Sequence, residues 1–277
     1  MKKATLLLTA LLSLTLLLLG GCNGNDEPKL KVMTSTSLMT YIVQQIGGNN
    51  VEALNLVPPN QHPGNFDVKP EDIQKLATAR LFLLHGWPGE TYVDKLVASA
   101  NNPNLTVVKA TVDGNWMIPS VQATAVDKVL STLCEIDPDN TTAYQKAAEK
   151  YKQRIQAKET DIKARLTKAD VSKINVIASF RQADFLTWAG FNVVATFGGT
   201  QTLTPQVIKD LVDKGKAANV TLIVNNIQDG QDAGKAIAEE LSAKNLNLSN
   251  FPGGFSNTET WEKAIDYNVS MLIDTIK

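Results

Sequence analysis

One segment in the middle of the chain restricts the fold more than any other. From Asn140 to about Thr167 the sequence has neither glycine nor proline, and apolar residues recur at mostly helical spacing among Lys, Glu and Gln. The Asp-Pro-Asp-Asn sequence at 137–140 supplies capping residues ahead of it. About 28 residues at about 1.5 Å each give a rod of roughly 42 Å, which is longer than one lobe needs. The segment predicts one stiff helix that connects two lobes; a long surface helix of a single continuous domain is the alternative.

Short apolar runs alternate with amphipathic stretches on both sides of this segment, which is the pattern of parallel α/β units. The first half contains four predicted strands, at residues 30–36, 51–57, 80–85 and 105–109. The second half contains a similar series, at residues 174–179, 193–197, 220–225 and 246–249. The sequence therefore predicts two α/β lobes with parallel sheets, joined by one long rigid backbone helix. The predicted boundaries are 30–138 for the N-terminal α/β lobe, 139–168 for the linking helix and 169–277 for the C-terminal α/β lobe.

Composition excludes several classes of function. Lys and Arg number 27 against 28 Asp and Glu, so the chain has no basic field for nucleic acid. Two Cys cannot build a disulfide framework, and two His leave few of the commonest transition-metal ligands. The sequence has no Gly-rich phosphate loop, no Gly-x-Ser-x-Gly elbow and no zinc-protease helix motif. The chain is therefore predicted not to be an enzyme.

The first residues have the features of an export signal. Lys2 and Lys3 precede an apolar run over 4–19, which is followed by two glycines and Cys22. A run of about 16 residues spans about 24 Å, which is short of the roughly 30 Å hydrocarbon core. The sequence at 19–22, Leu-Gly-Gly-Cys, resembles a bacterial lipobox. We predict a lipoprotein signal peptide over 1–21, lipidation at Cys22 and a flexible tether over 22–29; a plain secretory signal and an anchor helix are the alternatives.

The order of the predicted pieces resembles a known family over essentially the whole mature chain. Six short sequences carry the resemblance: Met33-Thr34-Ser35-Thr36-Ser37-Leu38, Leu56-Val57-Pro58-Pro59, Phe66-Asp67-Val68-Lys69-Pro70-Glu71-Asp72, Leu84-His85-Gly86, Trp116-Met117-Ile118-Pro119 and Ile136-Asp137-Pro138-Asp139-Asn140. They occur in the order found in the solute-binding lipoproteins of zinc and manganese ABC importers, the TroA-like cluster. The resemblance implies a monomer, lipid-anchored on the extracytoplasmic side of the cell membrane (periplasm or outer face), that delivers a ligand to an ABC permease and its ATPase.

The resemblance also implies a metal site, which this sequence does not reproduce. The family usually holds a bare divalent cation with three His and one carboxylate, two ligands from each lobe. The positions that match these four ligands are Gly64, Gly114, Ser179 (or Phe180) and Asn250. Glycine, serine and asparagine cannot replace imidazoles and a carboxylate as donors. The sequence therefore predicts a retained scaffold with a changed cleft.

Two kinds of ligand remain open for that cleft. His62, Asp67 and His85 are candidates for a substitute metal site, unless His62 is only a loop residue and His85 only caps a strand. Other residues near predicted strand ends suit an organic ligand better, because they offer aromatic faces or hydrogen bonds. These residues are Phe66, Trp87, Trp116, Arg181, Gln182, Asn226 and Asn250, with a surface ion pair to Asp184 as the alternative role of Arg181.

The predicted function is capture of a metal chelate or a small organic molecule between two lobes, for delivery to an importer. No resident cofactor is predicted beyond a divalent metal, free or as a chelate. Binding of bare zinc or manganese through the substitute ligands is one alternative, and a surface lipoprotein without a transport role is another.

Overall fold

The computed structural model describes residues 29–277 except residue 88. The predicted signal peptide, the predicted lipidation site Cys22 and residues 22–28 of the predicted tether lie outside the described residues. In the part of the chain that the structure describes, none of the helices is both long and apolar enough to cross a membrane.

Each lobe is built on a parallel four-stranded sheet with helices on its faces. The N-terminal sheet has the order β2-β1-β3-β4 and comprises β1 (Leu30–Thr34), β2 (Val51–Asn55), β3 (Leu81–Leu84) and β4 (Thr106–Lys109). The C-terminal sheet has the order β6-β5-β7-β8 and comprises β5 (Asn175–Ser179), β6 (Asn192–Phe197), β7 (Leu222–Asn226) and β8 (Lys244–Leu248). All the pairings are parallel. The predicted α/β class with two lobes is confirmed.

Helices connect these strands in both lobes. In the N-terminal lobe they are α2 (Ser37–Gly47), α3 (Pro70–Ala77), α4 (Val93–Ala100) and α5 (Pro119–Ile136). In the C-terminal lobe they are α7 (Phe180–Ala189), α8 (Pro205–Ala217), α9 (Lys235–Leu241) and α10 (Trp261–Ile276). In both sheets the second strand along the chain lies at one edge, followed in space by the first, third and fourth, so the second lobe repeats the architecture of the first.

The structure corrects some predicted element bounds. The first strand ends at Thr34 rather than at residue 36, because its neighbour β2 ends at Asn55 and α2 begins at Ser37. The C-terminal lobe also shows a bound set by its turns: α9 begins only at Lys235, because Asp232 has a left-handed backbone with φ 57° and the N–H of Gly234 donates to Asn225 Oδ1. The backbone conformation of single turn residues decides where these elements begin and end. The spacing of hydrophobic residues gives no information about that conformation.

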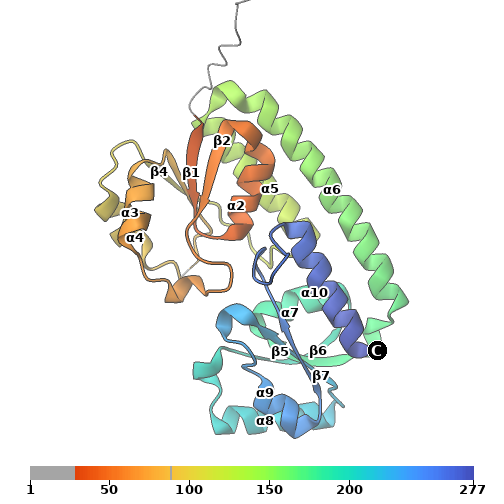
Figure 1. Ribbon diagram of the computed structural model, residues 1–277. Coiled ribbons are helices and arrows are strands. Elements are labelled where there is room, and N and C mark those ends of the chain that lie inside the picture. The colour runs from red at the N-terminus through yellow and green to blue at the C-terminus, as the bar shows by residue number, and fades with distance from the viewer. Residues whose placement is uncertain (1–28, 88) are drawn as a thin grey trace, which may run out of the picture.

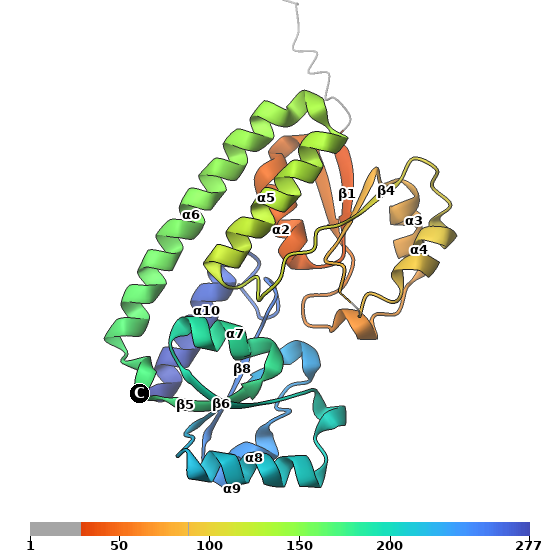
Figure 2. The same ribbon diagram turned by 180° about the vertical axis from the view of Figure 1, so that it is seen from behind.

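The linking helix α6 (Thr141–Lys168) runs along both lobes for 28 residues. Figures 1 and 2 show it as a rod that begins beside the N-terminal lobe and ends beside the C-terminal lobe. One face is buried, by Tyr144, Ala148, Tyr151, Ile155, Ile162 and Leu166. This face packs against α2 and α5 of the first lobe and against α10 of the second. The helix is therefore part of the core of both lobes rather than an exposed linker.

A single cluster of buried apolar side chains extends through both lobes. It includes side chains from β1, α2 and α5, the buried face of α6, and side chains from β5, β7 and α10. Helix α10 lies beside α6 and reaches the N-terminal lobe (Figure 1). The fully buried Trp261 at its first turn donates its indole N–H to the backbone carbonyl of Trp116, at 3.0 Å. The lobes therefore share one core, which opposes a wide hinge motion.

We predict that Trp261→Ala lowers the free energy of unfolding by about 3–5 kcal/mol, because it leaves a large cavity and an unpaired Trp116 carbonyl. Because the core is shared, both lobes should still unfold in one transition. Urea unfolding followed by far-ultraviolet circular dichroism and by tryptophan fluorescence tests both points. The exposed Lys263→Ala variant on the same helix is the control and should change the free energy by less than about 0.5 kcal/mol. Two separate transitions in the wild type would contradict the shared core.

Candidate functional site

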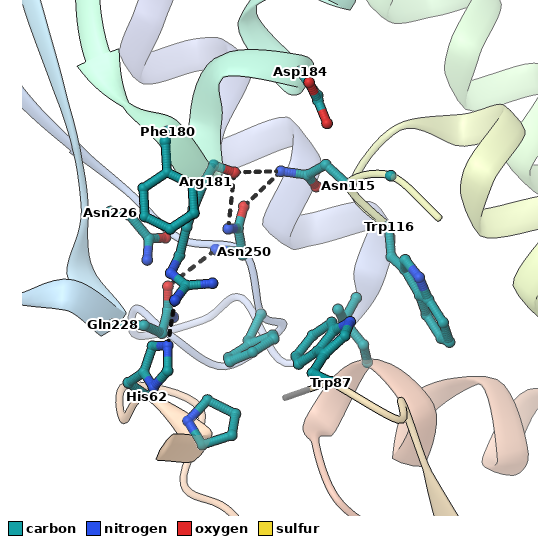
Figure 3. Close-up of a pocket in the computed structure, with 14 residues that line it drawn as sticks. His62, Trp87, Asn115, Trp116, Phe180, Arg181, Asp184, Asn226, Gln228 and Asn250 are labelled. Carbon is teal, nitrogen blue, oxygen red and sulfur yellow. Dashed lines mark hydrogen bonds between the residues drawn. The ribbon is translucent and has the colours of Figure 1, made fainter. Parts of the chain in front are cut away.

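A pocket of about 270 Å³ lies between the lobes, where the carboxyl ends of both sheets meet. In α/β folds this is where ligands bind. Figure 3 shows side chains from both lobes around it. The lining residues are Leu38, His62, Pro63, Trp87, Gly114, Asn115 and Trp116 from the first lobe, and Phe180, Arg181, Asp184, Asn226, Gln228, Asn250 and Phe251 from the second.

The structure brings together most, but not all, of the predicted cleft residues. His62, Trp87, Trp116, Arg181, Asn226 and Asn250 line the pocket. Gln182 lies just behind the wall, where its side-chain amide donates to Asn226 Oδ1 and Asn250 Oδ1. Phe66, Asp67 and His85 do not line the pocket.

One chain of polar contacts crosses the pocket from lobe to lobe. Arg181, in the first turn of α7, donates from Nε to Asp229 Oδ1 at 2.9 Å. Its Nη2 lies 2.6 Å from Nε2 of His62, on the loop after β2 in the other lobe. Arg181 therefore pairs with Asp229 and not with the Asp184 predicted as its alternative partner. Burial lowers the pKa of His62 and the nearby Arg181 lowers it further, while Asp229 opposes the shift, so the imidazole is neutral at pH 7.

A second set of contacts is made entirely by amides. Asn115 Nδ2 donates to the Arg181 carbonyl and to Asn250 Oδ1, both at 2.9 Å. Asn250 Nδ2 donates to the same carbonyl at 3.2 Å. Because Asn250 Oδ1 also accepts from Gln182 at 3.0 Å, its acceptor capacity is already used. The floor of the pocket is thus a neutral, hydrogen-bonded amide network that joins the two lobes.

The four positions that match the family's metal ligands cannot form a metal site. Gly114 has φ +97°, and a Cβ there would point at Val121 with a closest approach of 3.2 Å. Gly114 therefore lines the pocket with its backbone, and the neighbouring Asn115 contributes the side chain. A Cβ on Gly64 would lie 3.0 Å from the His62 ring. Ser179 caps α7, and its hydroxyl is 3.4 Å from Asp229 Oδ2. Restoring histidine at 114 would therefore require a change of backbone, and histidine at 64 would require the His62 ring to move.

The substitute metal site is not assembled either. Within residues 29–277, residue 88 apart, the structure has no group of three or more His, Cys, Asp or Glu that could hold a metal ion. Asp67 is exposed on its loop. His85 is buried, with Nε2 2.6 Å from Thr36 Oγ1 and its ring stacked on Trp87 at 3.7 Å. Its imidazole therefore serves as a packing partner of Trp87.

Aromatic side chains form the apolar part of the pocket. Trp87 lies roughly parallel to Phe251, with ring centroids 6.3 Å apart, and Phe180 is half exposed at the mouth. The loop that carries Trp87 is fixed by Glu90, whose carboxylate accepts backbone N–H bonds from residues 85, 86 and 87. Phe66 belongs instead to the N-terminal core, edge-on to Tyr92 at 5.2 Å. The pocket thus combines flat apolar faces with fixed amide groups.

Sequence reasoning missed several residues of this site. Asn115 was not predicted, because the family's ligand position was matched to the preceding Gly114. The position of the Asn115 side chain depends on the positive φ of that glycine. Asp229 lies on a short turn after β7, three residues beyond Asn226, whose Nδ2 donates to its Oδ2. Gln228 and Phe251 lie within a few positions of predicted residues, and Phe180, predicted only as an alternative match to a metal-ligand position, lines the pocket as an aromatic face. Proximity to a predicted strand end was the signal available for these residues other than Asn115.

Comparison with known proteins agrees with the fold and the resemblance. A family model described as zinc-uptake complex component A, periplasmic, matches residues 32–275. The chain belongs to this family. The metal ABC transporter substrate-binding lipoprotein SsaB of Streptococcus sanguinis is 25% identical over 75% of this chain and 78% of that protein. The manganese-binding lipoprotein MntA of Halalkalibacterium halodurans is 24% identical over 93% of this chain and 94% of that protein.

Solved structures of similar proteins share the fold. A crystal structure of ZnuA has a TM-score of 0.77 at 20% identity and covers 90% of this chain and all of that one. The solute-binding protein FpvC of Pseudomonas aeruginosa, solved in complex with Mn²⁺, also has a TM-score of 0.77, at 23% identity over 90% of this chain and 98% of that one. The zinc-uptake component A family is therefore represented here with its whole two-lobe fold.

The buried His85 leads to a prediction about acid stability. Burial lowers its pKa from 6.5 to about 3, so the folded protein keeps this imidazole neutral while the unfolded chain takes up a proton below pH 6.5. The stability that it contributes is fully present above pH 6.5. It is lost by up to about 1.4 kcal/mol per pH unit as the pH falls from there toward the folded pKa.

The His85→Gln variant places an amide near Thr36 but has no titrating ring. We expect its free energy of unfolding to fall less steeply with acid than that of the wild type, since all other titrating groups are common to both proteins. Urea unfolding at several pH values between about 7 and 4.5 measures the two slopes. Parallel slopes would show that His85 is not held neutral in the folded protein.

Proposed function

We propose that the chain is the extracytoplasmic solute-binding component of a metal-type ABC importer, and that its ligand is a metal chelate or small organic molecule rather than a bare ion. Membership of the zinc-uptake component A family supports the transport role. The names of SsaB and MntA, a substrate-binding and a manganese-binding lipoprotein, support a metal as part of the cargo. The family is one of transport proteins rather than enzymes, which supports a binding role without catalysis.

The composition of the pocket wall supports an organic ligand or a chelate. A bare zinc ion needs about four donors, chosen from imidazole, thiolate and carboxylate groups. The described residues offer no such group of three, and the amide oxygens of Asn226 and Asn250 already accept hydrogen bonds from Gln182. A bare ion would therefore have to break the amide network, and the nearby carboxylates, Asp184 in the wall and Asp229 in its ion pair with Arg181, belong to no group of three or more that could hold it.

A chelated metal avoids this difficulty because the chelator brings its own donor atoms. The protein then needs to supply shape, apolar faces and a few directed polar groups. Trp87, Phe180 and Phe251 provide the apolar faces, and Asn115, Asn250 and Arg181 provide hydrogen-bonding groups from both lobes. A volume of about 270 Å³ suits a small molecule.

The shared core supports a mechanism with little movement. Because α6 and α10 tie the lobes together, the protein would load and release its ligand through loop movement and a few degrees of tilt. Delivery would take place on a permease and its ATPase, with the body held at the membrane by lipid on Cys22. The basic residues, apolar run and Cys22 of the N-terminus support this anchoring.

The ligand itself is the first test. The mature chain is purified gently from its native host and analysed by native mass spectrometry together with elemental analysis. We expect an added organic mass, with or without a metal, that disappears on denaturation. One zinc or manganese ion per protein with no organic mass would contradict the proposal.

The response to bare ions is a second, independent test. A ligand present at about 100 times its Kd stabilises a protein by about 2.7 kcal/mol, which for this size raises the melting temperature by on the order of 5–10 °C. Zn²⁺ and Mn²⁺ should give no saturable rise of this kind. MntA of Halalkalibacterium halodurans, measured in the same buffers with Mn²⁺, is the positive control. A saturable rise equal to that of MntA would contradict the proposal.

A further inference from the structure

The contact between His62 and Arg181 places two hydrogen-bond donors against each other. His62 Nδ1 accepts from the N–H of Gly64 at 2.8 Å, so the neutral ring carries its proton on Nε2. That N–H faces Nη2 of Arg181 at 2.6 Å, and a guanidinium can only donate. In the other tautomer the proton is on Nδ1, so Nε2 accepts from Arg181 but the N–H of Gly64 then faces another N–H. Protonation of the ring leaves neither ring nitrogen able to accept. In each of these states one N–H group in this cluster, of Arg181, Gly64 or His62 itself, therefore faces another donor, and with Nδ1 accepting from Gly64 the contact between His62 and Arg181 has no acceptor.

The guanidinium of Arg181 is held in place by Asp229, and its terminal N–H groups can still donate hydrogen bonds. Arg181 donates from Nε to Asp229 at 2.9 Å, which sets the plane of its head. Its terminal nitrogens lie on the pocket side, between His62 and the amide of Asn250 (Figure 3). The ring of Phe180 stacks over the guanidinium with its centroid 4.7 Å from Cζ, so the approach that remains open is along the edge. Edge-on approach is how guanidinium binds a carboxylate through two parallel hydrogen bonds.

We propose that the ligand of the cleft presents a carboxylate or a similar planar oxyanion, which inserts at His62 and Arg181 and accepts hydrogen bonds from both. This inference rests on the proposed function, since it names the chemical class of the ligand bound in the same pocket. The oxyanion is the acceptor that the two facing donors lack. With it in place, His62 keeps its bond from Gly64 and donates from Nε2, while Arg181 keeps its ion pair with Asp229.

The surrounding residues define the rest of the ligand. Phe180 is half exposed, and Trp87 and Phe251 lie roughly parallel to each other in the same pocket. These aromatic faces favour a flat apolar or aromatic body next to the oxyanion. Asp184 lies apart from the guanidinium at another side of the pocket (Figure 3). Its carboxylate is exposed, so water screens its repulsion of a bound anion, and it would favour a neutral or positive group at that end, including a chelated metal.

A matched pair of probes isolates the oxyanion. Benzoate and benzamide have the same ring and nearly the same shape, but only benzoate carries the charge and two acceptor oxygens. We expect benzoate to bind the metal-free wild-type protein saturably, in the millimolar range appropriate to a fragment, and about tenfold or more tighter than benzamide. Calorimetry measures the affinities. Nitrogen-resolved NMR should show the Nε2–H of His62 and the guanidinium of Arg181 shifting with benzoate.

Two arginine variants provide the comparison. Arg181→Gln should weaken benzoate about tenfold or more and leave benzamide unchanged. Arg80→Gln removes the same charge from an exposed site, where Nη1 donates to the carbonyl of Asn104, and should leave benzoate binding unchanged. Melting temperatures establish that both variants are folded; if Arg181→Gln is not, the benzoate and benzamide affinities of the wild type decide alone. Equal affinities for the two probes, no saturable benzoate binding, or benzoate binding unaffected in a folded Arg181→Gln protein would overturn the inference.

Failure of this inference can be told apart from failure of the proposed function. An organic ligand recovered without any acidic group, together with failure of the benzoate test, would overturn the oxyanion and leave the organic cargo standing. Recovery of one bare metal ion per protein would overturn the cargo itself, whatever benzoate does. Recovery of an acidic ligand, with the expected benzoate result, would support both.

Discussion

The continuous apolar core that runs along α6 and α10 is the constraint on which the rest of the structure depends. It fixes the two sheets so that their carboxyl ends face one pocket, and it sets the distance across which side chains of the two lobes must meet. Polar contacts complete the arrangement at the edge of the core, including Tyr41 to Glu262 at 2.7 Å and Arg165 to Asp266 at 3.0 Å. Because the scaffold is rigid, the chemistry of the pocket is decided by which side chains stand at fixed positions.

Those side chains differ in kind from the ligands that the family resemblance implies. Imidazoles and carboxylates would converge on a cation, but here neutral amides bond to one another and to the Arg181 carbonyl. Arg181 and Asp229 neutralise each other through a 2.9 Å hydrogen bond, and the remaining carboxylate of the pocket, Asp184, is exposed to solvent. A pocket of this kind offers directed hydrogen bonds and apolar faces but no concentrated negative charge. Such a pocket favours a ligand that does not need charged metal ligands from the protein, such as a chelate that brings its own donor atoms.

The sequence predicted the architecture well because the architecture follows from periodicity. The helix over 141–168 has no residue that would break it, and most of the strands contain short apolar runs, although β8 (Lys244–Leu248) alternates polar and apolar residues. The pocket was predicted less completely. The predicted strand ends indicated where His62, Arg181 and Asn250 would meet. The positive φ of Gly114, which places Asn115 in the pocket, cannot be inferred from residue spacing. The burial of His85 under Trp87 likewise depends on tertiary packing.

The central claim is that a cation-binding scaffold has become a receptacle for a larger ligand because its metal donors have been replaced. A crystal structure grown with excess Zn²⁺, with anomalous diffraction recorded at the zinc edge, tests this claim most directly. The structure predicts no zinc peak among Arg181, Asn115 and Asn250 and an intact amide network. A zinc ion there with three or four protein donors at about 2.0–2.3 Å would contradict it.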